Sequence, residues 1–186
     1  MRRLLFDGLI RSPVTEPAPP RDESALAELA RAVGTAATAR LGRSLAIRHV
    51  DAGSCNACEL ELHALGNPYY DLERYGLRFV ASPRHADVLL VTGPVTTNMR
   101  EALERTWAAM PAPKWLVAAG VCACDGGLFA SSYACCGGVA AVLPVDLHIP
   151  GCPPSPRALL AGLLALMAKT ASGRSSQRRL PGGSRR

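Results

Sequence analysis

The stretch ADVLLVTGPVT at residues 86–96 decides the fold class of this chain. Its centre, VLLV at residues 88–91, is a continuous apolar run that is too short for a helix of ordinary length. A strand with one wet face alternates polar and apolar residues, whereas a continuous run is typical of a parallel strand covered on both faces. Residues 87–92 are therefore predicted to form a buried strand of a parallel sheet.

Strand and helix patterns alternate on both sides of this strand. Further strands are expected at residues 45–50, 77–81, 114–119 and 145–149, and helices at residues 22–40, 59–65, 97–109 and 155–169. A chain that alternates in this way forms an α/β sandwich with a mostly parallel sheet. In such sheets, ligands sit at the carboxyl ends of the strands.

The 186 residues suffice for one ordinary domain, which we place at residues 22–170. Residues 1–21 form an N-terminal arm that ends in a proline-rich stretch. Six of the 21 basic residues and no acidic residue fall after residue 168, so 15 basic and 15 acidic residues balance in the remainder. Residues 171–186 are predicted to be a disordered basic tail. The domain has no basic stripe with interleaved aromatic residues, and nucleic-acid binding is not expected.

Seven cysteines are present, and four of them follow predicted strands. Cys55 and Cys58 come after the first strand, Cys122 after residues 114–119, and Cys152 after residues 145–149. The three loops are expected to meet at one edge of the sheet. Four thiolates are soft ligands that suit an iron–sulfur cluster or zinc. An odd number of cysteines and the lack of a secretory signal argue against a disulfide framework and predict a cytoplasmic protein.

Two other interpretations of the cysteines stay open at this point. Structural zinc sites use two close pairs of ligands, and only one pair exists here. A thioredoxin-like redox pair at Cys55 and Cys58 would leave the other two cysteines unexplained. Cys124 competes with Cys122 as the third ligand, because both lie in one glycine-rich loop. Together with Cys135 and Cys136 it is otherwise expected to be a small buried side chain.

Four motifs together resemble a known family of electron-transfer subunits. They are GSCNACELEL (53–62), ADVLLVTGPVT (86–96), AAGVCACDGG (118–127) and LPVDLHIPGCPP (143–154). They resemble the small subunit of membrane-bound NiFe hydrogenases and the homologous quinone-proximal iron–sulfur subunit of respiratory complex I. The resemblance covers about residues 45–168. It implies a flavodoxin-like three-layer fold and one 4Fe–4S cluster on Cys55, Cys58, Cys122 and Cys152.

The resemblance also implies a role within a larger assembly. The chain is expected to relay electrons to or from the active site of a large subunit, next to other iron–sulfur and membrane subunits. Cys55-x-x-Cys58 resembles the hydrogenase branch, of the energy-converting or formate hydrogenlyase type, because the complex I subunit has adjacent cysteines there. A complex I-type subunit that passes electrons to quinone is the alternative. Glu59 or Glu61 is a candidate proton relay. The expected location is the cytoplasmic face of the inner membrane, peripheral and held by partner subunits.

Overall fold

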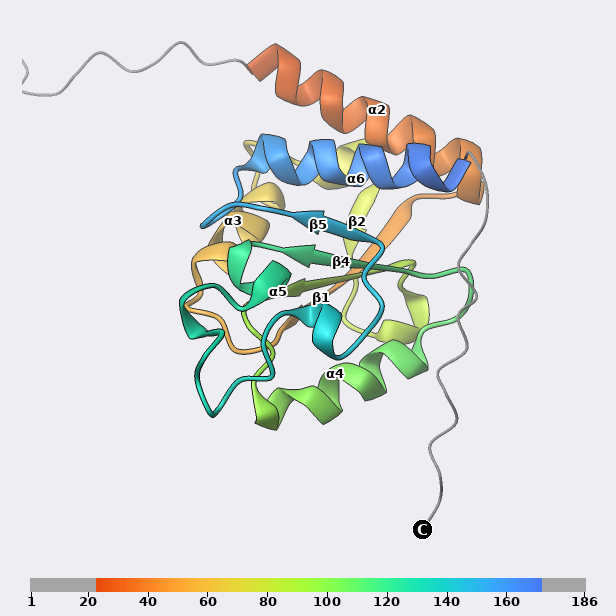
Figure 1. Cartoon of the computed structure of the whole chain (residues 1–186). Coiled ribbons are helices and arrows are strands. Elements are labelled where there is room, and N and C mark those ends of the chain that lie inside the picture. Colours follow the sequence, from red (N-terminus) through yellow and green to blue (C-terminus); the bar gives the residue numbers. More distant parts are fainter. Residues whose placement is uncertain (1–22, 172–186) are drawn as a thin grey trace, which may run out of the picture.

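Five parallel strands form one sheet in the computed structural model, which describes residues 23–171 (Figure 1). The strand order is β2-β1-β3-β4-β5, and every neighbouring pair is parallel. The strands are β1 (Leu45–Asp51), β2 (Leu77–Phe79), β3 (Val88–Thr92), β4 (Trp115–Ala119) and β5 (Leu147–Ile149). This order is that of flavodoxin-like folds, in which the chain reverses its direction of travel across the sheet between β1 and β3. The predicted fold class is confirmed.

Helices cover both faces of the sheet. They are α2 (Glu23–Leu41), α3 (Ala57–Leu65), α4 (Thr97–Ala109), α5 (Val121–Asp125) and α6 (Pro156–Ala171). Short 3-10 turns lie at η1 (Leu72–Tyr75), η2 (Pro83–His85), η3 (Gly127–Phe129) and η4 (Val139–Ala141). Figure 1 shows α2 and α6 side by side on one face and α4 on the opposite face.

Each face of the sheet has its own apolar core. Toward α2 and α6, Ile47 and Leu90 pack with Leu160 of α6. Toward α4, Leu89 and Leu116 belong to a second cluster that includes Leu103 of that helix. Successive residues of β3 therefore point into two different cores, and all five of its residues are buried. This arrangement explains why the strand has a continuous apolar run rather than an alternating pattern.

The predicted elements are present, with shifts at their ends. The strand expected at residues 77–81 stops at Phe79, and the strand expected at 145–149 begins at Leu147. At the second site the Asp146 carboxylate accepts a hydrogen bond from the Leu116 amide at 2.8 Å, so a side chain replaces the start of the ladder. Helix α5 is absent from the prediction because five residues between two glycines carry no helical period.

The predicted N-terminal arm and basic tail lie outside the described residues, apart from Ala171 at the end of α6. Between residues 23 and 171, none of the helices combines the length and the apolar character needed to cross a bilayer.

Candidate functional site: four thiols at the carboxyl edge of the sheet

The four predicted ligand cysteines lie in three loops that leave the same edge of the sheet. Cys55 and Cys58 sit in the β1–α3 loop and the first turn of α3, Cys122 in α5 directly after β4, and Cys152 directly after β5. The first loop is shaped by Asp51, whose Oδ1 accepts hydrogen bonds from two following amides at 2.8 and 2.7 Å. The chain thus turns sharply at the end of β1 and delivers the cysteine pair to the start of α3.

The thiols influence one another's ionisation. Burial, and then the negative charge of Glu59 and of the other three cysteines, raises the pKa of Cys58 to about 11. The pKa of Cys122 is also raised, first by burial and then by Cys152 and Cys55. Charge interactions of this kind weaken with distance, so the four thiols lie in one neighbourhood.

Glycines make room for the sulfur atoms. A Cβ at Gly120 would lie 2.7 Å from Sγ of Cys58, and a Cβ at Gly127 would lie 2.9 Å from Sγ of Cys122. Both glycines have positive φ angles, of 95° and 51°. The loops after β4 and β5 are tied together, because the Val121 amide donates to the Gly151 carbonyl at 2.9 Å. These positions require glycine both for backbone conformation and for space.

The donor set fits an iron–sulfur cube in its chemistry. Within residues 23–171, no three His, Cys, Asp or Glu side chains are gathered tightly enough to hold a single metal ion. A cube asks for a different arrangement, because each of its four thiolates binds a separate iron atom. It therefore needs four thiols that are near one another but not gathered on a single ion, and the pKa of Cys58 is raised by the charges of Cys55, Cys122 and Cys152.

The three remaining cysteines face other surroundings. Sγ of Cys124 points to the Ala118 carbonyl at 3.8 Å, and its side chain packs against the α4-side core. Cys136 packs against the same core, and its amide donates to Val95 at 2.7 Å. Cys135 forms an isolated antiparallel bridge with Thr96. The thiols whose charges act on Cys58 are those of Cys55, Cys122 and Cys152, and this favours Cys122 over Cys124 as the third ligand.

A buried carboxylate lies directly beside the first cysteine pair. The Glu59 residue is 5% exposed, and both of its carboxylate oxygens accept hydrogen bonds. Oε2 accepts from the Ser54 hydroxyl and Oε1 from the Thr92 hydroxyl. Glu61 is only half-buried. Of the two candidate proton relays, Glu59 is therefore the one fixed next to the thiols.

Sequence reasoning missed the partners of Glu59. His49 of β1 places Nε2 2.9 Å from the Thr92 hydroxyl oxygen and 3.7 Å from Oε1 of Glu59. Burial lowers the pKa of His49, while the nearby Glu59 and Asp51 charges oppose this effect. The clue in the sequence was the place of these residues in their strands. Thr92 is the last residue of β3, and His49 lies two residues before the end of β1.

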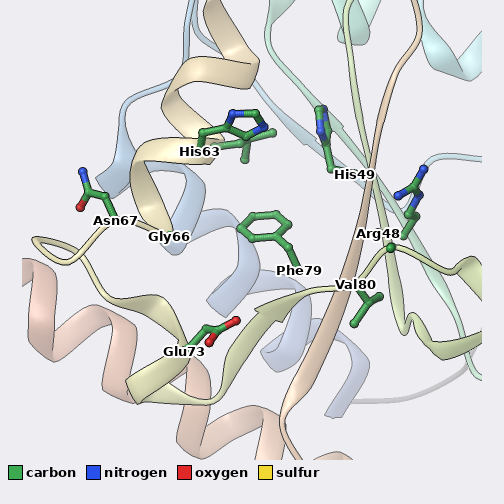
Figure 2. A pocket seen from close by; sticks show the side chains of 10 residues that line it. Arg48, His49, His63, Gly66, Asn67, Glu73, Phe79 and Val80 are labelled. Atoms are coloured by element: carbon green, nitrogen blue, oxygen red, sulfur yellow. The ribbon is translucent and has the colours of Figure 1, made fainter.

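A cavity of about 520 Å³ borders His49. It lies between β1, α3 and the end of β2, and His49, His63 and Phe79 are among its lining residues. Figure 2 shows these three lining side chains, each of which comes from a different element.

The family model described as NADH ubiquinone oxidoreductase, 20 Kd subunit, matches residues 55–166 of the chain. The chain belongs to this family. The matched range contains all four thiols of the site and strands β2 to β5, whereas β1, which leads into the first cysteine pair, lies before it. The resemblance seen in the sequence motifs is thus confirmed.

Relatives in this 20 kDa subunit family carry names from both of its branches. The chain is 46% identical over 123 residues to formate hydrogenlyase subunit 7 of Escherichia coli (strain K12), covering 66% of this chain and 48% of the relative. It is 44% identical over 131 residues to the probable membrane-bound hydrogenase subunit mbhJ of Pyrococcus furiosus, covering 70% and 78%. It is 48% identical over 119 residues to a subunit of the NADH-quinone oxidoreductase of Citrifermentans bemidjiense, covering 64% and 69%. The chain therefore spans about half the length of the Escherichia coli relative.

Among solved structures, the chain resembles one chain of the membrane-bound sulfane sulfur reductase, an archaeal respiratory membrane complex. The TM-score is 0.63, the identity is 32%, and 77% of each chain is covered. Members of the family are thus subunits of multi-subunit oxidoreductases, and the fold found here is the one they share.

Proposed function

We propose that this chain holds one 4Fe–4S cluster on Cys55, Cys58, Cys122 and Cys152 and relays electrons within a larger oxidoreductase complex. The observation that carries the proposal is that four cysteines lie in three loops at the same edge of the sheet, with Cys55, Cys122 and Cys152 near enough to Cys58 to raise its pKa. When bound, such a cluster supplies reversible one-electron transfer. The chain itself supplies the thiolates, the glycine-lined space and a site partly shielded from water, which together tune the redox potential.

The surface around the thiols supports a partner subunit as the cover of this site. Cys55 and Cys152 are exposed at the edge of the sheet. Large apolar side chains of α3 and of the segment after α5 are also exposed, with Leu60 at 61%, Leu128 at 95% and Tyr133 at 99%. Apolar side chains this open to solvent are typical of a protein–protein contact. We assign this surface to the large subunit that carries the active site.

Within the family, we place the chain in a hydrogenase-like complex of the energy-converting or formate hydrogenlyase type. The support is the Cys55-x-x-Cys58 spacing and the relatives named as hydrogenlyase and hydrogenase subunits. The alternative is a complex I-type subunit that passes electrons to quinone, which the similarity to the NADH-quinone oxidoreductase subunit favours. In both cases the chain would sit at the cytoplasmic face of the inner membrane, held by its partners.

The test is anaerobic purification of the complex with analysis of iron, sulfide and zinc, followed by electron paramagnetic resonance after reduction. We expect iron and sulfide in equal amounts from this chain and a signal that disappears in Cys58→Ala but persists in Cys124→Ala. Zinc in place of iron, or a full signal in Cys58→Ala, would contradict the proposal. Nickel in the associated large subunit would separate the hydrogenase type from the quinone type.

A further inference from the structure

A groove lined by aromatic side chains runs along the first turns of α2. Its volume is about 320 Å³, and it lies between α2, residues 68–75 and Leu160 of α6. Tyr69, Tyr70 and Tyr75 line it, and the rings of the first two meet edge to face with their centroids 4.8 Å apart. Among the described residues, none that lines the groove is charged. Grooves of this composition bind proline-rich segments in the polyproline II conformation.

The chain has such a segment directly before α2. Residues 13–20 read PVTEPAPP. Polyproline II has three residues per turn, so residues three apart in the sequence share a face. Val14, Pro17 and Pro20 therefore make one wholly apolar face, whereas each of the other two faces includes a polar side chain, such as Glu16. One face of the segment thus matches the apolar and aromatic character of the groove.

The length of the segment matches the length of the groove. Leu26 and Ala30 of α2 line the groove, and the helix rises about 10 Å from Glu23 to Ala30 at 1.5 Å per residue. In the polyproline II conformation, residues 17–20 extend about 9 Å at 3.1 Å per residue. Two residues, 21 and 22, separate this segment from the helix and are enough for the centre of a tight turn. A chain that reverses there runs back along α2 over the groove.

We propose that Pro17 and Pro20 bind in this groove, so that the N-terminal arm folds back along α2 and covers residues 68–75. This contact goes beyond the proposed electron relay and does not depend on a cluster. The family model matches from residue 55, so the arm is outside the range that the family shares. Asn67 and Glu73, which are next to or within the covered segment, line the cavity that borders His49 (Figure 2). The bound arm therefore braces a segment that also forms part of the cavity wall.

The test is hydrogen–deuterium exchange of residues 68–75 in the intact complex. The Tyr69 and Tyr70 amides donate to Oδ1 of Asn67 at 2.9 and 3.1 Å in an exposed turn, so a covering segment slows their exchange. The main variant combines Pro17→Ser with Pro20→Ser. We expect exchange about tenfold faster than in the wild type, because the burial of about two methylene groups corresponds to such a factor.

The matched control combines Pro13→Ser with Pro19→Ser. It also removes two prolines, but from a face that the groove does not contact, and it should leave the exchange rate of residues 68–75 unchanged. Equal exchange in the wild type and the main variant would overturn the inference, because the groove would then be open or covered by another subunit. Equal acceleration in both double variants would also overturn it, since the effect would not depend on the face. If the main variant does not assemble, Pro20→Ser alone decides by a smaller acceleration, and unchanged exchange in it overturns the inference.

Discussion

At the residue scale, the thiol of Cys58 shows how the site constrains its own ligands. Its pKa is raised to about 11 because the side chain is partly buried beside Glu59 and the other thiols. In the cluster-free chain it therefore keeps its proton at neutral pH. Binding of a thiolate ligand releases that proton, so cluster loading is coupled to proton release.

This shift predicts a pH-dependent loss of stability in the cluster-free chain. The unfolded chain loses the Cys58 proton near pH 9, whereas the folded chain holds it until about pH 11. The unfolded state thus binds fewer protons across this window, and the free energy of unfolding falls as pH rises. Urea unfolding of reduced, cluster-free protein at pH 8, 9 and 10 measures the effect. Cys58→Ser should show a smaller decline than the wild type, and an equal decline would contradict the assignment.

Individual residues also mark the limit of sequence reasoning. The four cysteines could be predicted as ligands from the sequence because they follow apolar runs that are visible locally. The network of His49, Thr92 and Glu59 was not found, because Thr92 lies 43 residues from His49 and 33 residues from Glu59 and meets His49 only through the register of β1 and β3. A threonine at the end of a buried strand has many possible hydrogen-bond partners. The packing of α3 against the sheet brings Glu59 to Thr92.

At the element scale, the turn from β4 into α5 depends on Gly120. Its φ of 95° belongs to a region that side chains rarely adopt, and a Cβ there would meet Sγ of Cys58. Gly42 also has a positive φ, of 68°, but a Cβ there would meet nothing within 4 Å. Comparing substitutions at the two glycines therefore separates the effect of backbone strain from the effect of filling the space next to the sulfur atom.

We predict different outcomes for alanine at these two glycines. Gly42→Ala should cost about 1 kcal/mol of stability from its left-handed backbone alone and leave the cluster intact. Gly120→Ala should cost about 1–3 kcal/mol from backbone strain, and more from the contact with sulfur, and should remove most of the cluster. Thermal unfolding and iron content of both variants test this. Full iron content in Gly120→Ala would show that the glycine does not shape the site.

The strands and long helices were predictable because each has a period or run within its own residues. Helix α5 and the short ends of β2 and β5 were not, because contacts from elsewhere set them. Asp146 replaces the beginning of β5 with a side-chain hydrogen bond to β4, and no pattern around residue 146 announces this. Where tertiary contacts override local preference, the single sequence carries no signal.

At the scale of the whole molecule, we propose that the thiol edge and the exposed apolar side chains of the segment after α5 belong to one surface that a partner covers. Leu128 and Tyr133 lie in the segment that follows α5, and they are almost fully exposed. A side chain in this state contributes little to the fold of the isolated chain and is free to pack against a partner.

We therefore predict that Leu128→Ser and Tyr133→Ser together weaken assembly with the large subunit about tenfold or more, which corresponds to about 1.4 kcal/mol. The stability of the isolated chain should change by less than about 0.5 kcal/mol. Glu101→Gln on the solvent face of α4 is the control and should assemble normally. Affinity purification of the complex from cells measures the loss. Normal assembly of the double variant would place the partner on another face.

The central claim is that Cys55, Cys58, Cys122 and Cys152 surround one iron–sulfur cube. An iron-edge anomalous density map from anaerobically prepared complex tests it most directly. We predict a compact four-iron peak bonded to these four sulfur atoms, with Cys124, Cys135 and Cys136 unbound. A single-ion peak, or iron bonded through Cys124 in place of Cys122, would contradict it.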